Sequence, residues 1–190
     1  MIIFNTSIII IHIDNIKTYL PKFMSNKPLL GNEKIRLKDH LPLAMPVSIM
    51  IDPSNLCNFR CNFCPTSDNA LLKKFSRPKG MMEISLFEKI IDDIDNLKKK
   101  TKINPKSLLL YKDGEPLLNK NIDKMISYAK QKNVVDYIGV TTNASLLKED
   151  MTNKLLNTNL DTLRVSIQSL TQENFQNITK TKFDIKKITK

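Results

Sequence analysis

The sequence contains no tryptophan, four glycines and three cysteines, and it has no long apolar segment. A membrane-spanning helix needs roughly 20 consecutive apolar residues, so the sequence does not predict a membrane protein. The low glycine content, together with nine prolines, excludes the collagen-like and low-complexity classes. Three cysteines are an odd number and cannot form a closed disulfide framework, so we expect the thiols to serve another purpose.

Arginine is also scarce: four of the 30 basic residues are arginine, and the 19 acidic residues leave a net charge of +11. A basic chain can be a nucleic-acid binder, but recognition of bases and phosphates relies on arginine and on aromatic side chains. Aromatic residues make up 6% of the chain, and the lysines are spread along it beside 23 isoleucines and 19 asparagines. The charge therefore indicates a compositional bias, and we expect no nucleic-acid partner.

The amino-terminal segment lacks the basic region and the cleavage site of a secretory signal. The run 8–11 predicts a strand or an ordered apolar tail, and a true start at Met24 is an alternative. Since nothing indicates export, we expect a cytoplasmic protein in a reducing compartment. The remaining composition, 41% hydrophobic and 26% charged, is typical of one globular domain. We expect a poorly defined leader over 1–45 and a core domain over 46–190.

The core domain reads as strands alternating with helices. Four runs rich in branched residues predict buried parallel strands, over 47–51, 107–111, 137–142 and 163–167. Apolar residues at helical spacing predict helices between them, over 87–97, 122–129 and 146–156, with a fourth after Thr171. This order predicts an α/β fold with a parallel sheet, in which ligands bind at the carboxyl ends of the strands.

All three cysteines lie within eight residues, as Cys57, Cys61 and Cys64, in the loop after the first predicted strand of the core. A loop this short can direct three thiolates at one centre, so metal ligation is the leading interpretation. Zinc normally takes a fourth protein ligand, and His12 and His40 lie upstream without a paired spacing. Three thiolates suit a 4Fe-4S cluster with one open iron; free thiols or a small zinc loop are the alternatives.

The cysteine triplet, with Phe63 directly before its last member, resembles the signature of radical S-adenosylmethionine (radical SAM) enzymes. Three later motifs are similar to those of the same family and follow the later strands in the same order. They are Asp-Gly-Glu-Pro at 113–116, Thr-Thr-Asn at 141–143 and Ser-Ile-Gln at 166–168. The sequence around the cysteines is most similar to the branch of peptide-maturing and sugar-modifying enzymes.

The resemblance implies an oxidoreductase-type enzyme with a 4Fe-4S cluster on Cys57, Cys61 and Cys64. In the family, S-adenosylmethionine occupies the open iron and is cleaved reductively to a 5'-deoxyadenosyl radical, which takes a hydrogen atom from the substrate. The resemblance also implies a set of cofactor-binding residues: Phe63, Gly114, Glu115, Asn143, Ser166 and Gln168. Glu115 would accept hydrogen bonds from the cofactor's amino group, Gly114 would allow a close backbone approach, and Phe63 would pack near the adenine or shield the cluster.

Simpler roles exist for two of these residues. Glu115 can stabilise a helix start after Pro116, and Asn143 can be a turn or capping residue. The sequence also departs from the family pattern in two places, because Asp113 replaces a glycine and Gln168 stands where many relatives have aspartate.

The family fold is a six-unit partial (β/α) TIM-like barrel, and this chain accounts for about four βα units of it. We therefore expect an incomplete barrel, with an unpaired edge on the last strand and a tendency to associate. A flavodoxin- or ferredoxin-like reductant, an unknown substrate and a second chain that completes the barrel are the partners that this implies. The alternative to an enzyme is a catalytically incomplete iron-sulfur binding fragment, or a subunit of a split enzyme.

Overall fold

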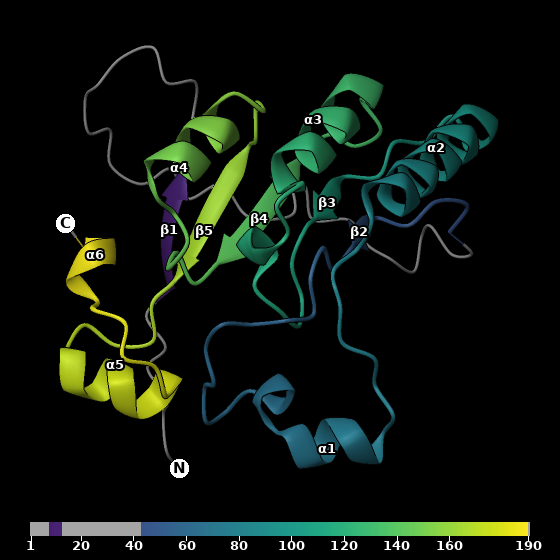
Figure 1. Cartoon of the computed structure of the whole chain (residues 1–190). Helices are drawn as coiled ribbons and strands as arrows, with labels where there is room; N and C mark the ends of the chain where they lie inside the picture. Colours follow the sequence, from purple (N-terminus) through teal and green to yellow (C-terminus); the bar gives the residue numbers. More distant parts are fainter. Residues whose placement is uncertain (1–7, 13–42, 190) are drawn as a thin grey trace.

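The computed structural model describes residues 8–12 and 43–189, and within them strands and helices alternate as predicted (Figure 1). Four strands pair in parallel and in sequence order: β2 (Ser48–Met50), β3 (Ser107–Leu109), β4 (Ile138–Thr142) and β5 (Thr162–Ser166). A helix follows each strand, which gives four βα units. The predicted α/β fold, a partial TIM-like barrel, is confirmed.

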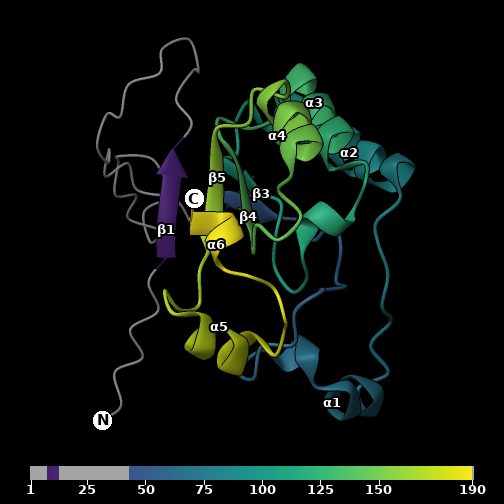
Figure 2. The same cartoon turned by 60° about the vertical axis from the view of Figure 1, so that its left-hand side comes forward.

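Three helices cover one face of the sheet (Figures 1 and 2). They are α2 (Ile84–Thr101), α3 (Ile122–Lys132) and α4 (Glu149–Leu156). Two short helices, α1 (Asn69–Lys74) and α5 (Gln172–Thr179), lie beyond the carboxyl ends of the strands, and α6 (Lys186–Thr189) follows α5. This end of the sheet is therefore the one on which ligand-binding loops are expected.

A fifth strand, β1 (Ile8–His12), pairs antiparallel with β5, with Ile8 opposite Ser166 and His12 opposite Thr162. The strand predicted for this segment is confirmed. The expectation that the outer edge of β5 is unpaired is wrong, because the backbone of β1 occupies it and the sheet order is β1-β5-β4-β3-β2. The rest of the predicted leader, including Met24, lies outside the described residues.

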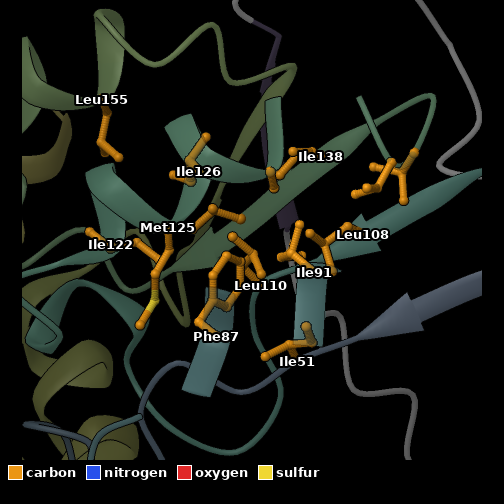
Figure 3. Close-up of a cluster of buried hydrophobic side chains, with 14 of the residues drawn as sticks. Ile51, Phe87, Ile91, Leu108, Leu110, Ile122, Met125, Ile126, Ile138 and Leu155 are labelled. Atoms are coloured by element: carbon orange, nitrogen blue, oxygen red, sulfur yellow. The ribbon is translucent and has the colours of Figure 1, made fainter. Parts of the chain in front are cut away.

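A large hydrophobic core fills the space between the sheet and helices α2, α3 and α4 (Figure 3). We call it the large cluster, and its fully buried members include Phe87, Ile91, Leu108, Leu110, Ile122, Met125, Ile126, Ile138 and Val140. On α2, Phe87, Ile91 and Ile94 recur every three or four residues, which puts them on one face of the helix. The helix-covered face of the sheet is thus the apolar one.

The shortage of glycine is visible where helices end. Lys102, Asn133 and Lys180 follow α2, α3 and α5 with φ of 60°, 48° and 51°, in the left-handed region. Glycine is the usual residue there because it has no Cβ to clash with the backbone. These helices end in the same geometry with a side chain present.

Candidate functional site

The loops that follow β2, β3 and β4 are hydrogen bonded to one another at the carboxyl edge of the sheet. The amide of Glu115, after β3, donates to the carbonyl of Leu56, after β2, at 2.8 Å. The amide of Asn143, after β4, donates to Oε2 of Glu115 at 2.8 Å. The structure therefore brings the predicted site residues of three different loops together where ligands bind in such folds.

Cys57, Cys61 and Cys64 are free, half-buried thiols on one short loop. The loop turns tightly: the amide of Cys64 donates to the carbonyl of Cys61 at 3.0 Å, and a 3-10 turn (Pro65–Ser67) follows. Burial raises the pKa of Cys57, and burial followed by the nearby Cys57 and Cys64 raises the pKa of Cys61 to about 11. Burial therefore disfavours the thiolate forms of Cys57 and Cys61, and a metal cation bound to these sulfur atoms would offset that cost.

The cysteine loop is fastened to the last turn of α5. The amides of Arg60 and Asn62 donate at 2.9 Å to the carbonyls of Thr179 and Ile178. The last carbonyls of a helix have no partner within the helix, so the loop satisfies two groups that α5 leaves free. The predicted fourth helix thereby acquires a role in the site that its sequence gave no reason to expect.

Phe59, between the first two cysteines, adds an apolar anchor. It is buried, and its ring lies 5.7 Å from that of Phe175, edge to face, and 6.1 Å from that of Phe183. We call this group the aromatic cluster; its buried members are Phe59, Ala144, Val165, Ile167, Phe175 and Ile185, with Phe183 packed on them. Cys57 and Cys61 also pack against it, so the cluster sets the position of the loop that carries the thiols.

Glu115 is 2% exposed and is surrounded by donors. Its Oε1 accepts from the hydroxyl of Thr142 at 2.5 Å and from the amide of Leu117 at 3.1 Å, and its Oε2 accepts from Asn143. The contact with Leu117 caps the 3-10 turn η3 (Pro116–Leu118), which is the simpler role considered for this residue. No ion pair within residues 43–189 includes Glu115, and burial raises its pKa.

Gly114 is needed for a backbone contact inside the protein. A Cβ at this position would lie 2.0 Å from the carbonyl oxygen of Ser54 and 2.6 Å from that of Leu56. The glycine thus permits a close contact with the segment that leads into the cysteine loop, and its approach to a cofactor stays a prediction. Asp113, which replaces the family glycine, forms an ion pair with Arg77 and fixes the loop from outside.

Asn143 joins the turn after β4 to the cysteine loop. Its Oδ1 accepts from the amide of Ser145 at 3.0 Å, as in a turn, which is the simpler role considered for it. Its Nδ2 donates to Oδ1 of Asn58 at 2.9 Å and lies 3.9 Å from Sγ of Cys57. Asn143 and Glu115 therefore form one chain of contacts from the buried carboxylate to the first thiol.

Three other predicted residues stand apart from this network. Ser166 ends β5 and Gln168 follows it, and the side chains of both make no hydrogen bond with the part of the chain that the structure describes. Gln168 lines a hollow of about 340 Å³ with residues of the β5–α5 segment, among them Leu170 and Asn174. Phe63 is 61% exposed, so most of its side chain is open to solvent.

The donor set suits a soft metal centre and a cationic ligand. Within the described ranges, the three thiols and their neighbours are not held in a finished coordination geometry, so a metal would have to draw them together. Three soft sulfur donors match an iron-sulfur cluster. The buried carboxylate of Glu115 keeps one acceptor position on Oε2 and has no positive partner, as expected for a site that receives a cationic group.

Sequence reasoning missed Phe59 and the docking of the loop on α5. The loop contains two phenylalanines, and nothing in the sequence distinguishes the buried Phe59 from the exposed Phe63. It missed Asn58 as well, because a hydrogen bond across 85 residues leaves no pattern in the sequence.

The comparisons with known proteins agree with this site. The family model of the radical SAM superfamily matches residues 51–190. Relatives include the GTP 3',8-cyclases of Clostridium botulinum, 30% identical over 132 residues, and of Staphylococcus haemolyticus, 31% identical over 144 residues. These matches cover 70% and 75% of this chain but 38% and 40% of the relatives, so the chain spans about two fifths of their length.

A solved structure shares the fold. The crystal structure of BtrN in complex with AdoMet and 2-DOIA superposes with a TM-score of 0.52 at 20% identity, over 63% of this chain and 44% of that one. No helix within residues 43–189 is long and apolar enough to span a bilayer. Members of the superfamily bind a 4Fe-4S cluster and S-adenosylmethionine, and the fold, the cysteine loop and the match over 51–190 together show that this chain belongs to the radical SAM superfamily.

Proposed function

We propose that this chain holds a 4Fe-4S cluster on Cys57, Cys61 and Cys64 and binds S-adenosylmethionine beside it. When bound, these two groups supply a 5'-deoxyadenosyl radical for hydrogen abstraction from a substrate. The observation that carries the proposal is the chain of contacts from Glu115 through Asn143 to Cys57. It ties a buried, cation-free carboxylate to the first of three thiols, which is the arrangement that a cationic ligand next to a metal centre requires.

The roles of the residues follow from their surroundings. Glu115 would accept a charge-assisted hydrogen bond from the cofactor's amino group through the free position on Oε2. Asn143 holds the cysteine loop against this carboxylate, and Gly114 keeps the two loops in backbone contact. Ser166 and Gln168, at the end of β5, would bind the ribose hydroxyls with polar groups that make no hydrogen bond to the described residues. Phe63 is exposed and free to turn onto the adenine or over the cluster.

The substrate and the partners of the reaction are part of the same proposal. The similarity to GTP 3',8-cyclases supports a nucleotide as one substrate class, and the sequence around the cysteines supports a peptide or a sugar. Reduction of the cluster needs an external one-electron donor, for which we propose a flavodoxin- or ferredoxin-like protein in the cytoplasm. A second function, that of an iron-sulfur binding fragment or subunit, is favoured by the short span of the chain relative to its relatives.

Anaerobic reconstitution with iron and sulfide, followed by reduction in the presence of S-adenosylmethionine, tests the proposal. We expect about four irons per chain and the appearance of 5'-deoxyadenosine, both of which should be lost in Cys57→Ala. Iron binding without 5'-deoxyadenosine would favour the fragment over the enzyme. A chain that binds no iron would contradict both.

A matched variant separates the cluster from the cofactor. Glu115→Gln keeps all three thiols, so it should bind as much iron as the wild type. Loss of the charge-assisted hydrogen bond should weaken the binding of S-adenosylmethionine by about 10- to 100-fold. Unchanged affinity, measured by titration of the reconstituted protein, would remove Glu115 from the cofactor site.

A further inference from the structure

The face of the sheet opposite the helices carries a row of polar side chains. Leu110, Val140 and Leu163 belong to the large cluster on the helix-covered face. Because side chains alternate along a strand, the next residues, Tyr111, Thr141 and Arg164, lie on the opposite face. Thr141 and Arg164 are direct partners in the pairing of β4 with β5.

Tyr111 completes the row from β3. The amide of Leu110 donates to the carbonyl of Gly139 at 2.8 Å, which continues the parallel register past Leu109 and brings Tyr111 level with Thr141. The guanidinium of Arg164 lies 5.9 Å from the centre of the Tyr111 ring, and its Nη1 donates to the Tyr111 hydroxyl at 3.3 Å. The three side chains therefore meet across three neighbouring strands.

Arg164 has no anionic partner within residues 43–189, although it is 8% exposed. Its Nε is buried without an acceptor, and no ion pair in the described part of the chain includes it. The acidic residue closest in sequence, Asp161, pairs with Lys130 at 2.5 Å and also accepts from the amide of Ile138. The hydroxyl of Thr141 on the same face is likewise buried without a hydrogen-bond partner among the described residues.

A buried arginine without an acceptor is costly, since buried charges are normally paired and buried donors hydrogen bonded. Two unused donors, Nε of Arg164 and the hydroxyl of Thr141, lie on neighbouring strands of this row, and the guanidinium offers a planar fork that fits a carboxylate or a phosphate. We propose that Arg164, Thr141 and Tyr111 form a binding site for an anionic group, a carboxylate or phosphate, of the substrate. This assignment rests on the proposed function, because it places the substrate on the inner face of the barrel next to the site described above.

The row is partly accessible. Tyr111 and Thr141 are both partly exposed, whereas Nε of Arg164 and the hydroxyl of Thr141 are buried, so an anion reaches these two donors only if the side chains around them move. Arg164 lies two residues before Ser166, the last residue of β5. The anion would therefore bind deeper in the barrel than the groups held at the ends of the strands.

Nuclear magnetic resonance of the arginine side chains tests this on the full chain without any cluster. The sequence has four arginines, so the 15N-labelled protein has four Nε–H signals, and Arg164→Lys identifies the relevant one by its disappearance. Inorganic phosphate and acetate are the probes for the two anion classes. We expect at least one of them to shift the Arg164 signal saturably while the signal of Arg77, already in an ion pair, stays in place. No shift at Arg164, or an equal shift at Arg77, would overturn the proposal.

Thermal unfolding gives a second measurement, and its result would differ if Arg164 had a purely structural role. If Arg164 is kept for a ligand, Arg164→Met removes an unpaired buried charge and should raise the melting temperature by about 2–4 °C in anion-free buffer. The probe that shifts the Arg164 signal should stabilise the wild type and no longer stabilise this variant. A lower melting temperature for Arg164→Met, with stabilisation by the anion unchanged, would contradict the proposal.

The reconstituted protein distinguishes the source of the anion. S-adenosylmethionine also carries a carboxylate. It is therefore added to the reconstituted protein as a third probe, without phosphate or acetate. If it shifts the Arg164 signal and competes with phosphate, the site belongs to the cofactor and the assignment to the substrate is wrong. Failure of iron to bind would defeat the proposed function but leave the response of the cluster-free chain to phosphate and acetate intact, so the two failures are distinguishable.

Discussion

The large cluster and the aromatic cluster show how this chain separates its stability from its site. The large cluster joins three helices to the sheet and is mainly aliphatic; Phe87 is its one aromatic residue among those the structure describes as buried there. The aromatic cluster is smaller and joins Phe59, in the cysteine loop, to α5 and to Phe183 near the end of the described chain. The first cluster fixes the sheet, and the second fixes the thiols on it.

This division makes different substitutions report on different properties. A change in the large cluster should alter the free energy of unfolding and leave the folded site intact. A change in the aromatic cluster should alter the position of the cysteine loop with a smaller effect on overall stability, because most of the buried surface lies elsewhere.

The largest effect is expected for Phe87→Ala. Phe87 is fully buried between α2 and the sheet (Figure 3), and removal of a buried phenylalanine side chain costs about 3–5 kcal/mol. Denaturation with urea should show this decrease in the free energy of unfolding. Under conditions where the variant is folded, it should still bind iron on reconstitution. Loss of iron from the folded variant would mean that the two clusters are coupled.

Gly114→Ala should have the next largest effect, because it acts at the boundary between the two regions. The new methyl group would overlap backbone atoms of Ser54 and Leu56, and an overpacked position costs typically about 1–3 kcal/mol. The strand-to-loop segment would have to move, and Cys57 with it. We expect both a lower free energy of unfolding and a lower iron content.

A matched control for this substitution is Gly80→Ala, since a Cβ at Gly80 meets no atom within 4 Å. It should leave stability and iron content close to those of the wild type. A loss of iron in Gly80→Ala similar to that in Gly114→Ala would show that the contact with Ser54 is not the cause.

Those features of the two clusters that depend on local sequence pattern could be predicted from the sequence. The strands, the helices that cover them and the apolar face of α2 follow from periodicity, and the grouping of Cys57, Glu115 and Asn143 follows from their places after parallel strands. The aromatic cluster could not be predicted, because Phe59 and Phe175 are 116 residues apart and nothing local relates them. The pairing of β1 with β5 was missed for the same reason: register between distant strands depends on tertiary packing.

Phe175→Leu should lower stability less than Gly114→Ala while still reducing iron binding. The change keeps an apolar side chain of similar size and should cost about 1 kcal/mol, but it removes the edge-to-face contact with Phe59. Hydrogen exchange of the cluster-free protein should show faster exchange at the amides of Arg60 and Asn62, which are bonded to α5. Iron content after reconstitution should fall in parallel.

Ile126→Val is the control for this prediction, because it removes one methyl group from the large cluster at a cost of about 0.5–1.5 kcal/mol. It should destabilise the protein by a similar amount without changing either the exchange of Arg60 and Asn62 or the iron content. Equal losses of iron in the two variants would mean that the site responds to overall stability and not to the aromatic cluster.

The smallest effect is a change in the pH dependence of stability caused by Glu115. Burial raises the pKa of this carboxyl group above 4.5, its ordinary value, against the opposing effect of three hydrogen bonds. The folded protein therefore retains a proton that the unfolded chain has lost. The resulting stabilisation is fully present below the pKa of the unfolded chain and is lost as the pH rises through the pKa of the folded state.

Urea denaturation of the cluster-free protein at several pH values upward from 4.5 measures this contribution. Glu115→Gln has no proton to lose, so its free energy of unfolding should fall less steeply with rising pH than that of the wild type. Glu83→Gln removes an exposed carboxylate at the start of α2 and should run parallel to the wild type. If Glu115→Gln also runs parallel, the carboxylate is already balanced by its hydrogen bonds, and the site has no need of the positive charge that a bound cofactor would bring.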